Sequence, residues 1–115
     1  MLRILLVEDS PDDAELLRFA LDDAGIAHDL RRVWSRTALL DALRDDAPTL
    51  AISDLNLPGF GGVEALRLVQ AERPGLPMLL LSGAPGEVPR DLPARVLDKA
   101  ALQSLPALLR GMLPA

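Results

Sequence analysis

Short apolar runs alternate with amphipathic stretches along most of the chain, and this alternation constrains the fold more than any other feature. The runs have strand length, and the stretches between them carry apolar residues at helical spacing. The expected strands are residues 3–7, 29–33, 50–54, 76–81 and 96–97. Strands that alternate with helices predict βα units and a parallel sheet covered on both faces. We therefore expect an α/β, doubly wound fold.

Helix start and stop signals bound the amphipathic stretches. Ser10 and Pro11 are placed to cap and open a first helix, and Gly25 to end it. Ser35 can cap a second helix, which Pro48 stops. Apolar spacing predicts the buried stripes of four helices: Leu17, Ala20 or Leu21, and Ala24; Leu39, Leu40 and Leu43; Val63, Leu66 and Val69; and Leu102, Leu105, Leu108, Leu109 and Met112.

Residues 83–93 break this pattern. They contain three prolines and two glycines, which disfavour a full helix. We expect a loop there, with at most one turn between Glu87 and Leu92.

Composition narrows the class of protein. The 115 residues, half of them apolar, suit one domain over residues 1–115. The absence of cysteine excludes thiol catalysis and agrees with a cytoplasmic location. No apolar run has the length of a membrane span, and the first residues lead into a strand without a signal peptide. A net charge of −5 and only three aromatic residues argue against nucleic-acid binding.

Polar residues stand where four of the strands end: Glu8 and Asp9, Asp54, Ser82, and Lys99. Ligands of open α/β sheets bind outside the carboxyl ends of the strands. If the first and third strands are neighbours, three carboxylates converge, and their repulsion requires a cation. Oxygen ligands favour Mg²⁺ over soft metals. A carboxylate nucleophile, a lysine ammonium and a serine hydroxyl would then form a pocket for a phosphoryl group.

Each of these residues also has an ordinary structural interpretation. Acidic residues are common at the start of a helix, Asp54 can cap a turn, and a lysine is usually solvated. The joint placement at four separate strand ends favours the functional interpretation.

Four ordered motifs resemble the bacterial response-regulator receiver domains of the CheY-like fold. They are residues 5–11, residues 53–58 together with Gly62, residues 81–83 and residues 97–99. The resemblance implies a five-stranded parallel sheet of order 2-1-3-4-5. It also implies that Mg²⁺ is the cofactor and that a sensor histidine kinase or a histidine phosphotransfer protein donates the phosphoryl group.

The same resemblance assigns roles to single residues. It implies that Asp54 is the phosphoacceptor and a metal ligand, Asp9 a direct metal ligand and Glu8 a water-mediated one. The main-chain carbonyl of Asn56 would complete the metal site, and Ser82 and Lys99 would contact the phosphoryl group.

Three features depart from the family pattern. Ala100 replaces the usual proline after the conserved lysine, so we expect a trans Lys99–Ala100 bond, because a cis bond without proline costs about 3 kcal/mol. Val96 stands where the family usually has an aromatic switch residue. The segment from Ser82 to Lys99 is shorter than usual by roughly five residues, more than one helical turn, so we expect the fourth helix to be shortened or replaced by a loop.

Other functions stay open at this stage. The main alternative is a pseudo-receiver that binds proteins without phosphorylation. A haloacid-dehalogenase-type phosphatase needs an Asp-x-Asp pattern after the first strand, whereas the chain reads Asp9-Ser10-Pro11-Asp12. An FMN carrier of the flavodoxin type is disfavoured because Glu8 and Asp9 would repel its phosphate. The expected function is a receiver that signals by protein contact and catalyses only its own phosphorylation and dephosphorylation.

Overall fold

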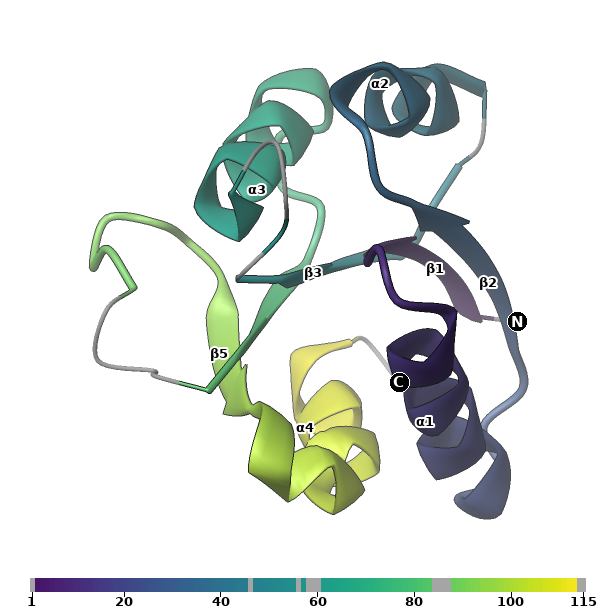
Figure 1. Cartoon of the computed structure of the whole chain (residues 1–115). Helices are drawn as coiled ribbons and strands as arrows, with labels where there is room; N and C mark the ends of the chain where they lie inside the picture. The colour runs from purple at the N-terminus through teal and green to yellow at the C-terminus, as the bar shows by residue number, and fades with distance from the viewer. Residues whose placement is uncertain (1, 46, 56, 58–60, 84–87, 114–115) are drawn as a thin grey trace.

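A computed structural model describes residues 2–45, 47–55, 57, 61–83 and 88–113 of the chain. Its centre is one sheet of five parallel strands in the order β2-β1-β3-β4-β5 (Figure 1). The strands are β1 (Leu2–Val7), β2 (His28–Val33), β3 (Leu50–Asp54), β4 (Met78–Ser82) and β5 (Arg95–Asp98). The doubly wound sheet and its predicted strand order are therefore confirmed.

Helices cover both faces of the sheet, as Figure 1 shows. One face carries α2 (Arg36–Asp45) and α3 (Gly62–Glu72), and the other carries α1 (Pro11–Asp23) and α4 (Leu105–Met112). A short 3₁₀ helix, η2 (Lys99–Ser104), leads from β5 into α4. Alternate residues of β1 enter the two cores: Leu5 and Val7 pack on the α2 and α3 side, and Ile4 and Leu6 pack on the α1 and α4 side. Across the described ranges, every helix falls short of the length and apolar character that a membrane span requires.

The capping signals act as predicted. The Ser10 hydroxyl accepts a hydrogen bond from the Asp13 amide (3.2 Å) and caps α1, and Ser35 does the same for α2 through Ala38 (3.1 Å). Gly25, with φ of +71°, turns the chain after α1, as few other residues could. Not every predicted stripe residue is buried. Ala42 of α2, outside the predicted stripe, lies in the core, and six stripe residues are only half-buried: Ala24, Leu40, Val63, Leu102, Leu108 and Met112.

The segment between β4 and β5 carries no regular helix among its described residues, Gly83 and 88–94. Leu92 is buried in the core beside α3, and its amide donates to the carbonyl of Pro89 in a turn. Arg67 of α3 binds both carboxylate oxygens of Asp91 at 3.2 Å. The predicted loop is confirmed for these residues. Asp91 and Leu92, near its end, hold it against α3.

Candidate phosphoryl and metal site

Glu8 is the first residue beyond β1, and its backbone is still held by the sheet. Its amide donates to the carbonyl of Val33 at 2.9 Å, and its Oε1 accepts from the Ser10 amide at 3.1 Å. The side chain is only 2% exposed. Burial, with a smaller contribution from the nearby charge of Asp54, raises the pKa of Glu8 to about 7. A cation in the site would favour the charged carboxylate.

Asp54 ends β3 and is 4% exposed. The first residue of α3, Gly62, returns so close that a Cβ atom there would stand 2.0 Å from the Asp54 carbonyl oxygen. Only glycine tolerates this approach. The Gly62 amide also donates to the carbonyl of Leu55 at 3.0 Å, which closes the connection from β3 to α3.

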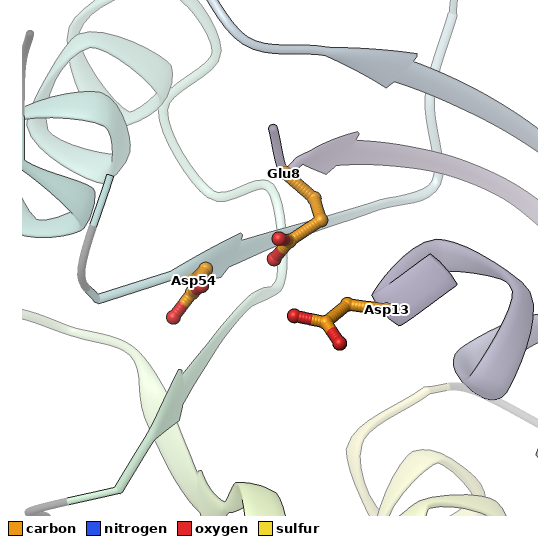
Figure 2. A group of neighbouring side chains, drawn as sticks. All are labelled: Glu8, Asp13 and Asp54. Atoms are coloured by element: carbon orange, nitrogen blue, oxygen red, sulfur yellow. The ribbon is translucent and has the colours of Figure 1, made fainter. Parts of the chain in front are cut away.

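Asp13, in the first turn of α1, completes a group of three carboxylates with Glu8 and Asp54. One oxygen from each lies within 4.8 Å of the others. Figure 2 shows the three as neighbours, with the side chains of Glu8, after β1, and Asp13, on α1, directed toward Asp54 at the end of β3. The sequence pattern does not single out Asp13, which reads as an ordinary acidic residue in the first turn of a helix. The signal that could have identified it is the Ser10 cap, which turns the chain back so that the third helical residue lies beside the end of β1.

Lys99 supplies the positive charge of the site. Its Nζ donates to Asp54 Oδ2 at 2.8 Å and lies 3.6 Å from Asp13 Oδ2. Partial burial lowers the pKa of Lys99, but the hydrogen bond to Asp54 and the charges of the three carboxylates outweigh it, so the pKa is raised. The ammonium therefore stays protonated at neutral pH.

The chain after Lys99 differs from the family pattern in the way that the sequence predicts. The Lys99–Ala100 bond is trans. Asp98 Oδ1 accepts a hydrogen bond from the Ala100 amide at 2.9 Å and begins η2. Lys99 still reaches Asp54 across this turn, although alanine instead of proline follows it.

The other predicted site residues lie as follows. Ser82 is buried at the end of β4, one residue beyond Leu81, the partner of Asp54 across the sheet. The side chain of Asp9 is exposed and does not join the three clustered carboxylates. Its role as a metal ligand stays a prediction. Asn56 lies outside the described residues.

The donor set fits a hard divalent cation. All three clustered groups offer carboxylate oxygens, the ligand type that Mg²⁺ prefers. Three carboxylates at this separation repel one another, and the single ammonium of Lys99 offsets only part of that charge. The site therefore offers the ligand chemistry and the negative charge that suit a hard divalent cation such as Mg²⁺.

Two cavities beside the sheet are lined by described residues. The smaller, about 90 Å³, adjoins the carboxylates and is lined by Leu6, Glu8, Asp13, Leu16, Leu17, Leu81, Lys99 and Leu102. The larger, about 390 Å³, lies around Arg3, Asp29, Arg31 and Pro48, near the starts of β1 and β2. None of the strand-end residues of the site lines it.

Comparison with known families and proteins gives a consistent result. The sequence profile of the response regulator receiver domain matches residues 4–103. A protein-glutamate methylesterase/protein-glutamine glutaminase of Nitrosospira multiformis is 32% identical over 108 residues, which cover 92% of this chain and 30% of that protein. The response regulator protein FleR of Pseudomonas aeruginosa is 39% identical over 94 residues, covering 80% of this chain and 19% of FleR. The chain thus spans about a third or less of these relatives.

Solved structures share the fold. The response regulator TrrA of Thermotoga maritima, solved in complex with Mg²⁺-BeF, superposes with a TM-score of 0.80 at 23% identity and covers 98% of this chain and 100% of its own. A CheY-like receiver domain of Methylobacillus flagellatus gives 0.81 at 24% identity, with coverage of 97% and 98%. At this level of identity the likeness supports the fold alone.

Proposed function

The chain belongs to the response regulator receiver domain family, and on that premise we propose that residues 1–115 form a receiver whose phosphoacceptor is Asp54. The observation that carries the proposal is the contact between Lys99 Nζ and Asp54 Oδ2 at 2.8 Å inside the cluster with Glu8 and Asp13. A buried carboxylate that ends a strand beside a lysine and two further carboxylates suits the charge changes of phosphoryl transfer.

The proposed reaction transfers a phosphoryl group from a phosphohistidine of a sensor kinase or a histidine phosphotransfer protein. A carboxylate oxygen of Asp54 forms a bond to phosphorus as the phosphorus–nitrogen bond breaks, and the histidine ring leaves and takes up a proton. The product is an aspartyl phosphate. Lys99 would move its hydrogen bond from the carboxylate to a phosphoryl oxygen, and the Ser82 hydroxyl would donate to another.

Mg²⁺, when bound, would neutralise the charge that gathers on the phosphoryl oxygens. Glu8, Asp54 and the newly identified Asp13 would face it. We also propose, from the family pattern, that Asp9 and the carbonyl of Asn56 take part. The exposed position of Asp9 would then change when the cation enters.

The output of the domain is proposed to be protein contact in the cytoplasm. The chain is proposed to catalyse only its own phosphorylation and dephosphorylation, without acting on another substrate. Among its relatives are a DNA-binding response regulator, MtrA, and a methylesterase, but the aligned residues make up only 34% and 30% of those proteins. Their activities are therefore not assigned to these residues.

Incubation with acetyl phosphate and Mg²⁺, followed by intact-mass measurement, tests the proposal. We expect the mass to rise by one phosphoryl group in the wild type and in D12N, and no rise in D54N or without Mg²⁺. Asp12 is the matched control because it is an exposed aspartate in the first turn of α1, next to Asp13, and lies outside the carboxylate group.

An unmodified wild type that still binds Mg²⁺ would favour the pseudo-receiver. That alternative rests on Ala100 and Val96, which depart from the family pattern. What favours phosphorylation is that all five pocket residues of the family pattern are present: Glu8, Asp9, Asp54, Ser82 and Lys99.

A further inference from the structure

Arg32, near the end of β2, joins the edge of the sheet to the acidic loop that follows β1. Its Nη1 donates to the carbonyl oxygen of Glu8 at 3.3 Å and to that of Asp9 at 3.4 Å. Glu8 belongs to the carboxylate cluster, and Asp9 is the metal ligand that the family pattern predicts. A single guanidinium thus contacts the backbone of both members of the acidic pair.

Trp34 supports this guanidinium from the other side. The Arg32 Cζ atom lies 4.2 Å from the centre of the Trp34 ring, a cation–π distance. Trp34 is 53% exposed, so packing in the core does not explain a tryptophan at this position. Between these two residues, the carbonyl of Val33 accepts the Glu8 amide. The end of β2 therefore holds the end of β1 through main chain and side chain together.

This arrangement is costly for a cation site. The positive charge of Arg32 lies beside the loop that would bind a dication, and like charges repel. An arginine kept in this place for its charge alone would weaken metal binding. Its two carbonyl contacts instead suggest that it fixes the course of the loop.

We propose that Arg32, held by Trp34, is a positioning residue that sets the Glu8–Asp9 backbone so that the acidic side chains are presented to the cation. The inference rests on the proposed function, since it concerns the same Mg²⁺ site. It adds to that site Arg32 of β2 and Trp34, the residue directly after β2, and neither of them touches the reacting atoms.

For loss of the Arg32 side chain, the proposal and simple electrostatics predict opposite changes in Mg²⁺ affinity. Loss of a positive charge should tighten Mg²⁺ binding if Arg32 acts only through its field. Loss of the two carbonyl contacts should weaken binding if Arg32 positions the loop, and partners of this kind change metal affinity by about tenfold or more. The direction of the change therefore decides between the two.

The test is an Mg²⁺ titration followed by backbone amide chemical shifts, which reports binding without phosphorylation. R32A should bind Mg²⁺ about tenfold more weakly than wild type, R32K should recover part of that loss, and W34L should be weakened while W34F stays close to wild type. R31A is the matched control, because Arg31 lies on the same strand and its side chain lines the distant cavity near Arg3. It should bind Mg²⁺ as the wild type does or slightly more tightly.

A second measurement uses the metal-free protein. The Ser10 amide is bonded to the Glu8 carboxylate, so its hydrogen exchange reports the order of the loop. We expect faster exchange at Ser10 in R32A than in R31A, with unchanged exchange in β4. Faster exchange everywhere would mean a general loss of stability and would overturn the positioning role.

The outcomes separate the two claims. Wild type that fails to bind Mg²⁺, or D54N that binds it equally well, defeats the proposed function. Wild type that binds Mg²⁺ while R32A binds it as tightly as R31A defeats this inference and leaves the proposed function standing.

Discussion

At the scale of single residues, the pKa of Glu8 predicts how stability depends on pH. Folding raises this pKa from an ordinary value of 4.5 to about 7 because the side chain is buried. A carboxyl of this kind stabilises the folded chain fully below the unfolded pKa, and the contribution is lost as pH rises through the folded value. Metal-free wild type should therefore lose stability between about pH 4.5 and pH 7 relative to E8Q, which has no charge to bury.

Urea unfolding of both proteins on either side of this window measures the effect. With Mg²⁺ present the loss should shrink, because the cation compensates the charged carboxylate. Stability curves that run parallel for wild type and E8Q would contradict the pKa assigned to Glu8.

Asp13 makes a separate prediction at this scale. It faces the other two carboxylates within 4.8 Å, and removal of its charge should weaken Mg²⁺ binding by about tenfold in D13N, from Coulomb's law with a water-like dielectric. D12N should bind as wild type does. Equal Mg²⁺ dissociation constants for D13N and D12N, from the same amide titration, would remove Asp13 from the site.

At the scale of elements, the connection between β3 and α3 sets the position of Asp54. G62A places a methyl group against the Asp54 carbonyl, so β3 or α3 must shift, and overpacking of this kind costs about 1–3 kcal/mol or more. G61A is the matched control, since a Cβ at Gly61 meets nothing within 4 Å. The thermal unfolding temperature and the Mg²⁺ affinity should both fall in G62A and stay near the wild-type values in G61A. Equal behaviour of the two variants would show that the close approach is not restrictive.

Among the described residues 88–94 between β4 and β5, Leu92 is the buried anchor. Leu92 is 5% exposed in the core beside α3, and L92A should lower the free energy of unfolding by about 2–4 kcal/mol. L16A, at a leucine 56% exposed on α1, should cost far less. Urea unfolding compares the two, and a small loss for L92A would mean that the segment is not held by this contact.

The elements themselves were largely predictable, because apolar runs and caps are local signals. The Ser10 and Ser35 caps and the βα alternation gave the strands and helices to within a few residues. The break between η2 and α4 was not predicted, since Leu102 and Leu105 continue one apolar stripe across it. The structural reasons are that Ala101 leaves helical geometry, with φ of −110° and ψ of 33°, and that Pro106 in the first turn of α4 has no amide to continue the hydrogen bonds.

At the scale of the whole molecule, the fold explains why the site could be predicted only in part. Placing β1 and β3 side by side brings Glu8 and Asp54 together, and β5 brings Lys99. The residues alone did not fix that strand order, and the family resemblance supplied it. Asp13 was missed because its contact depends on the angle at which α1 leaves the sheet, which is a tertiary property.

The most direct test of the central claim is to locate the phosphoryl group by borohydride reduction after phosphorylation with acetyl phosphate and Mg²⁺. Borohydride converts an aspartyl phosphate to homoserine, which peptide mass spectrometry assigns to a position. The account predicts homoserine at residue 54. This product should be absent when Mg²⁺ is omitted and less abundant in K99A than in wild type. Homoserine at Asp9 or Asp13 instead, or at no position in a protein that binds Mg²⁺, would contradict the account.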